Sequence, residues 1–310
     1  MLSKSSVLIR ASLGLGALAL FNNLMAVRSE RRHLPRGRFI EVDGVRLHYL
    51  DRGDGPPVVL IHGNGAMAED WEASTVFARL ATNHRVIAFD RPGFGYSKRP
   101  RDRIWTAGRQ AELIAEAMRL LGVGPATVAG HSWGAIVALE VALQRPEQVS
   151  RLVLLSGFYY PETRTDVALM SGTAVPLLGD VVAHTIVPPV GWLLRNAMFR
   201  AMFGPAPVAT RFRAKFPYGL SLRPTQVRAT AKDTGLMIPA VLALHGRIPG
   251  PTMPVAIMAG TGDMIVDFDR HSGRLHGALP DSTLHRLEGN GHMIQYSAPG
   301  EVARLIAGLD

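Results

Sequence analysis

Short runs of apolar residues recur along the chain from residue 57 onward. Each run is four or five residues long and nearly free of polar residues, which is typical of strands buried on both faces of a sheet. The runs lie at residues 57–61, 85–89, 126–129, 152–155 and 255–258, and a last strand is predicted at 283–287. Helical stretches lie between them at 68–80, 106–121, 133–144, 267–278 and 299–309. This alternation predicts a mainly parallel sheet with helices on both sides.

Two regions depart from the alternation. Asp43-Gly44 separates two short strand-like segments and predicts a β-hairpin. Residues 161–251 contain several prolines, apolar helical patches and few strand signals, which predicts an inserted helical cap. The expected organisation is an N-terminal hydrophobic segment and basic linker at 1–38, a core at 39–160 and 252–310, and a cap or lid at 161–251.

The strongest chemical signal is Gly130-His131-Ser132-Trp133-Gly134. It follows an apolar strand and opens a predicted helix, which is the context that a G-x-S-x-G nucleophile turn requires. The glycines suit a crowded turn with no room for side chains. Ser132 is therefore predicted to be an exposed nucleophile, with the start of a helix beside it to stabilise developing negative charge.

The chain resembles the α/β-hydrolase family from Phe39 to its end. Besides the Ser132 turn, it carries His62-Gly63-Asn64-Gly65, which is similar to the oxyanion loop of the family. The resemblance implies that the backbone N–H groups of Asn64 and Trp133 bind the oxyanion. A third motif, residues 90–97, is similar to the D-x-P-G-x-G-x-S loop of the family, which is structural, so Ser97 is not expected to be a nucleophile.

A serine hydroxyl needs a base, and the base needs an oriented acid. Asp263 follows the strand at 255–258, where the family places its acid, and His292 follows the last strand, where the family carries its base. Asp267 and Asp269 are rival acids, but they fall inside a predicted helix. His62 and His131 are expected to have structural roles. The predicted triad is Ser132, Asp263 and His292.

The amino-acid composition excludes several classes of nucleophile, cofactor and partner. The chain has no cysteine, which excludes disulfides and a thiolate nucleophile or metal ligand. It has no histidine and carboxylate cluster at metal-ligand spacing, so no metal and no cofactor are expected. Its net charge is +9. No basic patch interleaved with aromatic residues accompanies this charge, so a nucleic-acid partner is not expected and an anionic membrane surface is favoured.

The N-terminal segment bears on localisation. Residues 7–27 form a mostly apolar run that is short for a spanning helix, and five arginines follow it between residues 28 and 38. Basic residues at this position tend to hold the following domain on the cytoplasmic side. We expect a membrane-associated protein with a cytoplasmic catalytic domain, and an exported, periplasmic protein is the alternative.

The function expected from these observations is hydrolysis of a carboxylic ester or related acyl bond through an acyl-enzyme. C–C hydrolysis, amide cleavage and cofactor-free perhydrolysis use the same triad, and a non-catalytic accessory protein is an alternative of another class. Dehalogenation is not expected, because serine attack on an alkyl halide would give a stable ether. The substrate is expected to be an apolar small molecule, and five cap residues either line its pocket or form the core of the cap: Trp192, Met198, Phe199, Met202 and Phe203.

Overall fold

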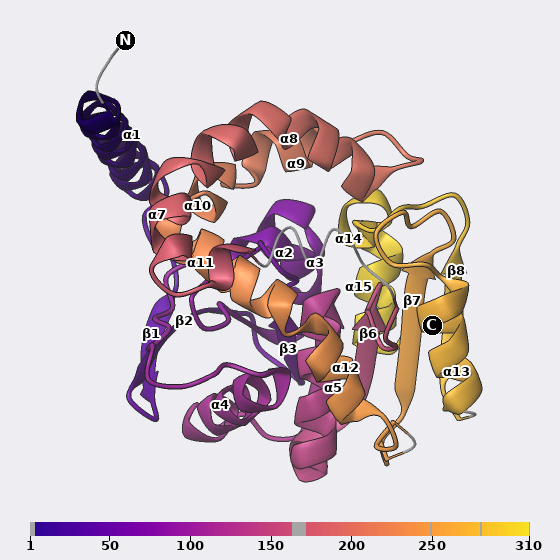
Figure 1. Ribbon diagram of the computed structural model, residues 1–310. Helices are drawn as coiled ribbons and strands as arrows, with labels where there is room; N and C mark the ends of the chain where they lie inside the picture. The colour runs from indigo at the N-terminus through magenta and orange to yellow at the C-terminus, as the bar shows by residue number, and fades with distance from the viewer. Residues whose placement is uncertain (1–3, 163–171, 249, 280, 310) are drawn as a thin grey trace.

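The computed structural model describes residues 4–162, 172–248, 250–279 and 281–309. Its centre is one eight-stranded sheet in the order β1-β2-β4-β3-β5-β6-β7-β8 (Figure 1). The strands β3 to β8 pair in parallel, while β2 pairs antiparallel with both β1 and β4. The strands are β1 (Arg38–Val42), β2 (Val45–Arg52), β3 (Pro57–Ile61), β4 (Arg85–Phe89), β5 (Ala126–His131), β6 (Val149–Leu155), β7 (Val255–Gly260) and β8 (Thr283–Leu287).

The predicted hairpin is present as the β1–β2 pair. Val42 pairs with Val45, so the loop between the strands is only Asp43-Gly44. Both loop residues have positive φ, 47° and 71°, which matches the right-handed twist of the two strands. The mainly parallel sheet expected from the apolar runs is thereby confirmed, with an antiparallel pair at its N-terminal edge.

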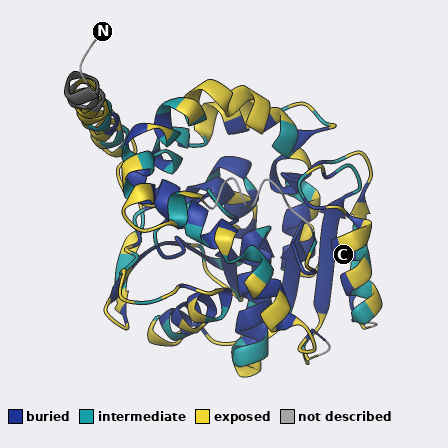
Figure 2. Cartoon of the chain, in the orientation of Figure 1, coloured by how far each residue is buried: buried dark blue, intermediate teal, exposed yellow. Residues whose placement is uncertain are grey.

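Helices cover both faces of the sheet. One apolar core lies between the sheet and α4 (Ala107–Leu120), α5 (Trp133–Gln144), α12 (Met237–Leu244) and α13 (Arg274–Ala278). The other lies beneath α2 (Glu69–Ser74), α3 (Val76–Leu80), α14 (Ile294–Ser297) and α15 (Pro299–Ala307). The central strands are buried from both sides (Figure 2), which explains their uninterrupted apolar sequence.

Two predicted helices differ in detail. The stretch 68–80 forms α2 and α3 with a break at Thr75, whose φ of 77° interrupts the helical backbone. The stretch 267–278 begins as a π-helical turn, η3 (Asp269–Gly273), before it continues as α13. Short 3-10 turns, η1 (Pro146–Gln148) and η2 (Gly172–Ala174), precede β6 and α7.

The segment between β6 and β7 is helical in its described residues. It contains α7 (Leu178–Thr185), α8 (Val187–Phe203), α9 (Thr210–Lys215), α10 (Tyr218–Ser221), α11 (Pro224–Gly235) and α12. The helices α8 and α9 lie across the top of Figure 1, over the ends of the strands, whereas α12 packs on α5. Only part of this insertion therefore forms a cover above the sheet.

The N-terminal segment forms one long helix, α1 (Lys4–Arg32), that contacts α7 and α10. The buried Asn22 donates hydrogen bonds to the carbonyls of His184 and Thr185, and Glu30 pairs with Arg223. Residues 28–32, expected in a linker, instead continue this helix. Among the described residues, no helix combines the length and the apolar character that crossing a bilayer would need.

Candidate active site

Ser132 occupies a strained turn between β5 and α5. Its φ and ψ are 55° and −120°, outside the regions that a serine usually adopts. A Cβ on Gly130 would lie 2.1 Å from the carbonyl oxygen of Gly134, and one on Gly134 would lie 2.3 Å from that of Ile61. Both glycines are therefore sterically required, and Ser132 alone of this turn is partly exposed.

Asp263 and His292 come together at the ends of β7 and β8. The Nδ1 atom of His292 lies 2.7 Å from Oδ2 of Asp263, and both side chains are almost entirely buried. The other carboxylate oxygen of Asp263 accepts hydrogen bonds from the backbone N–H groups of Ile265 and Val266. Burial alone would raise the pKa of Asp263, but the charge and hydrogen bond of His292 hold this pKa below its usual value.

The rival acids lie elsewhere. Asp267 and Asp269 are both exposed, and Asp267 caps the backbone N–H of Arg270. The geometry thus pairs His292 with Asp263 and with neither rival.

His131 links the Ser132 turn to the His292 loop. Its Nε2 atom lies 2.9 Å from the carbonyl oxygen of His292, and the two imidazole rings are 4.9 Å apart. Burial and the neighbouring His292 lower the pKa of His131 to about 3, so His131 is neutral and acts as a spacer. Within the described residues Ser132 and His292 share no hydrogen bond, a contact that in hydrolases often closes only with substrate.

The loop after β3 lies directly beside Ser132. A Cβ on Gly63 would lie 3.1 Å from Cβ of Ser132, so this glycine allows the loop to approach the nucleophile. Arg91, which is fully buried, donates to the carbonyl oxygens of His62 and Gly63 at 2.9 and 3.0 Å. Its backbone N–H donates to Nε2 of His62. The predicted oxyanion loop is therefore held from the side of β4.

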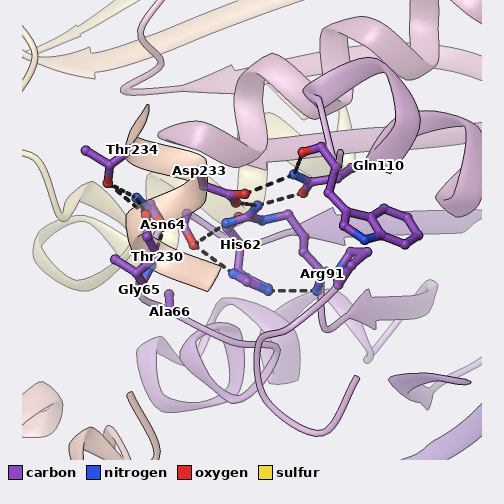
Figure 3. Close-up of polar contacts among 12 residues, drawn as sticks. His62, Asn64, Gly65, Ala66, Arg91, Gln110, Thr230, Asp233 and Thr234 are labelled. Atoms are coloured by element: carbon purple, nitrogen blue, oxygen red, sulfur yellow. Dashed lines mark hydrogen bonds and ion pairs between the residues drawn. The ribbon is translucent and has the colours of Figure 1, made fainter. Parts of the chain in front are cut away.

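Helix α11 holds the same loop from the other side (Figure 3). The Nδ2 atom of Asn64 donates to Oγ1 of Thr234 at 2.9 Å and to the carbonyl oxygen of Thr230 at 3.2 Å. Both amide hydrogens of Asn64 are thus used to anchor the loop. The side chain has no hydrogen left for a ligand, which leaves the backbone N–H as the group able to face one.

A buried ion pair completes this anchor and was missed by the sequence analysis. Asp233 of α11 binds Nη1 of Arg91 at 2.5 Å, and Gln110 donates to the same carboxylate (Figure 3). This carboxylate also binds Nη1 of Arg99 at 2.9 Å. The side chains of Arg91 and Asp233 are completely buried. In the sequence, Asp233 was only one acidic residue in a basic stretch, and no local pattern connects it with Arg91, 142 residues away.

The apolar cap residues divide between the cap core and the surface. Phe199 and Phe203 are buried with Phe212, and Met202 packs against this cluster. Trp192 and Met198 are exposed. The cluster also includes Met293 and Tyr296, which immediately follow the His292 loop, so the cap core borders the candidate base.

A second positioning contact comes from the cap. The backbone N–H of His292 donates to the carbonyl oxygen of Met202 at 3.0 Å, and a Cβ on Gly291 would lie 2.3 Å from the carbonyl oxygen of Gly204. The end of α8 thus fixes the loop that carries His292. In the described residues, no three His, Asp or Glu side chains are grouped as metal ligands.

The sheet order and the strand–turn–helix at Ser132 define a hydrolase of the α/β class. The family model of the alpha/beta hydrolase fold matches residues 56–299. A 2-hydroxymuconate semialdehyde hydrolase of Pseudomonas putida is 30% identical over 87% of this chain and 92% of its own length. Haloalkane dehalogenase 2 of Mycobacterium bovis is 27% identical over 87% of this chain and 93% of its own. The chain belongs to the α/β-hydrolase fold family.

One solved structure resembles almost the whole chain. It is a membrane phospholipase A, a bacterial virulence factor, and it aligns with a TM-score of 0.68 and 22% identity over 98% of this chain and 96% of its own. At this identity the likeness concerns the fold.

Proposed function

We propose that the protein is a serine hydrolase that cleaves a carboxylic ester, or a related acyl bond, through an acyl-enzyme. The observation that carries the proposal is the strained, partly exposed Ser132 beside a His292–Asp263 pair joined at 2.7 Å. Such strain is held where the surrounding structure uses it, as at a nucleophile. The arrangement favours a catalytic protein over an accessory protein without catalysis.

The proposed reaction begins with proton transfer from the hydroxyl of Ser132 to Nε2 of His292 as the serine attacks the acyl carbon. Asp263 keeps the proton on Nδ1 of His292 and stabilises the imidazolium that forms. The backbone N–H groups of Asn64 and Trp133 stabilise the oxyanion of the tetrahedral intermediate. His292 then protonates the leaving group, and a water molecule, activated by the same base, hydrolyses the acyl-enzyme.

Two observations bear on the substrate. The aromatic cap core borders the His292 loop, which supports an apolar small molecule. The relative named 2-hydroxymuconate semialdehyde hydrolase supports a semialdehyde as a second substrate class for the same triad. Dehalogenation is disfavoured despite the relative of that name, because residue 132 is serine and the amide hydrogens of Asn64 already bind α11.

The test combines active-site labelling with a substrate panel. A fluorophosphonate probe should label the wild-type protein, and the Ser132→Ala variant should lose both labelling and ester turnover while it keeps its fold. Ser97→Ala is the matched control and should still be labelled, because Ser97 is buried with its hydroxyl bonded to the carbonyl of Asp90. Near-normal turnover of Ser132→Ala would contradict the proposal. Esters of increasing chain length and a semialdehyde would then separate the substrate classes.

We also propose that the protein rests on a membrane surface through α1 and the adjoining cap helices. Apolar side chains are exposed along α1, α7 and α8, which contact one another in that order. They include Leu13, Leu20, Phe21, Leu24, Leu178, Val181, Leu193 and Leu194. An exposed apolar surface of this extent is typical of an interaction site, and the exposed Arg28, Arg31 and Arg32 beside it favour anionic headgroups.

A further inference from the structure

A cavity lies away from Ser132. It has a volume of about 460 Å³, and its lining residues come from the segment that follows α1, the end of α1, the β1–β2 hairpin, the loop after β4, and α11. The end of α1 and the hairpin lie on the left of Figure 1. None of the three candidate triad residues lines it. Its volume lies within the range of small-molecule sites.

The lining of this cavity is strongly basic. Seven of its sixteen lining residues are lysine or arginine, and one, Glu30, is acidic. Two nearby carboxylates each form ion pairs with two arginines. Asp180 pairs with Arg101 and Arg228. Asp233 pairs with Arg91 and Arg99. These pairs leave a surplus of positive charge.

Two lysines account for much of the surplus. In the described part of the chain, neither Lys98 nor Lys232 has a carboxylate partner. Burial and the positive charges of Arg99, Arg228 and Arg101 lower the pKa of Lys232. The lining of the cavity therefore carries an excess of positive charge, and a bound anion would neutralise part of it.

Two residues of the cavity lining, Tyr96 and Arg99, carry buried donors without acceptors. The side chain of Arg99 is only 8% exposed, and its Nη1 binds Asp233 and the carbonyl oxygen of Pro92. Its Nε and Nη2 atoms are buried and have no hydrogen-bond partner among the described residues, and the same holds for the hydroxyl of Tyr96. Unpaired buried donors are costly and uncommon in native proteins.

We propose that this cavity binds a phosphoryl anion, in the form of a phosphate monoester or diester group. Nε and Nη2 lie on one edge of the Arg99 guanidinium, and such an edge binds two oxygens of a phosphoryl group side by side. The Tyr96 hydroxyl supplies a further donor, and Lys98 and Lys232 supply charge. This site is separate from the proposed hydrolase centre and does not depend on it.

Two sources could present this group. One is a soluble phosphate compound, and the other is the headgroup of an anionic phospholipid, because Glu30 and Pro35 place the end of α1 at the cavity wall. Both use the same phosphoryl chemistry, so the experiment has one arm for each source.

The test uses the full-length chain. Inorganic phosphate is titrated at constant ionic strength, with binding followed by calorimetry. Separately, the protein is sedimented with phosphatidylcholine vesicles that contain or lack phosphatidylglycerol. Lys98→Gln/Lys232→Gln is compared with Lys215→Gln/Arg109→Gln, which removes the same charge from exposed positions outside the cavity. Arg99→Lys keeps the charge of Arg99 but removes its two-donor edge.

A soluble source would be supported if phosphate binds saturably and if Lys98→Gln/Lys232→Gln, the cavity variant, weakens this binding about tenfold or more. Lys215→Gln/Arg109→Gln, the control, should not weaken it. Vesicle binding that requires phosphatidylglycerol and weakens similarly in the cavity variant alone would support a lipid headgroup. Arg99→Lys should weaken whichever binding is found. The proposal is overturned if wild type shows neither binding, or if the two charge variants behave alike. Circular dichroism of each variant verifies the fold.

Discussion

At the scale of single residues, Asp263 uses each carboxylate oxygen for a different purpose. One oxygen accepts two backbone N–H groups and the other faces Nδ1 of His292. In Asp263→Asn the remaining oxygen will keep the backbone bonds, so the amide will point its N–H at His292. The imidazole must then carry its proton on Nε2, where it cannot accept one from Ser132.

We therefore expect Asp263→Asn to lower kcat by about three to four orders of magnitude while the protein stays folded. Steady-state kinetics on a water-soluble ester measures the loss. Asp267→Asn is the control, because Asp267 is exposed and should leave turnover close to wild type. A larger loss in the control than in Asp263→Asn would reassign the acid.

Asp70 predicts a pH dependence of stability. It is fully buried, accepts hydrogen bonds from Tyr296 and Gln295, and has its pKa raised by burial from 3.8 to about 6. The folded state thus binds this proton more tightly than the unfolded state. Ionisation of Asp70 therefore lowers the free energy of unfolding. This penalty increases as pH rises from about 4 to about 6, where it reaches roughly 3 kcal/mol.

Asp70→Asn removes the titration but can still accept a hydrogen bond from Tyr296. The free energy of unfolding of this variant should increase relative to that of wild type between about pH 4 and about pH 8, because only wild type develops the penalty of a buried carboxylate. Denaturant unfolding at both pH values measures the difference. A gap between variant and wild type that stays constant over this range would show that Asp70 does not ionise there.

At the scale of elements, α11 supports the proposed oxyanion loop. Its Thr234 hydroxyl accepts from Asn64, and its Asp233 holds Arg91, which binds the carbonyls of the same loop. A loop whose backbone N–H must meet a developing charge benefits from such support, since small displacements of donors weaken transition-state binding.

Thr234→Val keeps the shape of the side chain but removes the acceptor for Asn64. We expect kcat to fall about tenfold with KM little changed, and stability to fall by about 1–2 kcal/mol. Thr230→Val is the matched control, because Thr230 contacts Asn64 through its backbone carbonyl only. Equal turnover in the two variants would show that this support does not affect catalysis.

At the scale of the whole molecule, α1 is docked on the cap by polar contacts while its apolar residues face outward. Asn22 is buried against Thr185, whereas Leu20 and Leu24 are 62% and 61% exposed. This is the reverse of a helix whose apolar side packs on its own domain. In the proposed membrane association, a lipid surface would cover this exposed apolar side.

Leu20→Gln/Leu24→Gln should therefore weaken sedimentation with vesicles about tenfold or more. The control Ile104→Gln/Leu120→Gln changes two exposed apolar residues near α4, away from α1 in Figure 1, and should sediment like wild type. If both variants sediment like wild type, the surface of α1 does not attach the protein to membranes.

Local sequence determined the strands, most helices and the Ser132 turn. Burial on both faces requires uninterrupted apolar runs, and the crowding at Gly130 and Gly134 admits only glycine, so both features can be predicted from a few neighbouring residues. The order of Ser132, Asp263 and His292 along the chain was sufficient to predict which acid and base would meet, with the help of the family resemblance.

Only the tertiary structure decided how distant segments support one another. The pairing of Arg91 with Asp233, the docking of α1 on α7 and the basic cavity around Arg99 all join residues separated by more than a hundred positions. Periodicity and turn chemistry act over a few residues and contain no information about such pairs. Those contacts arise because an unpaired buried polar group is costly, so most such groups find a partner in whichever element packs beside them.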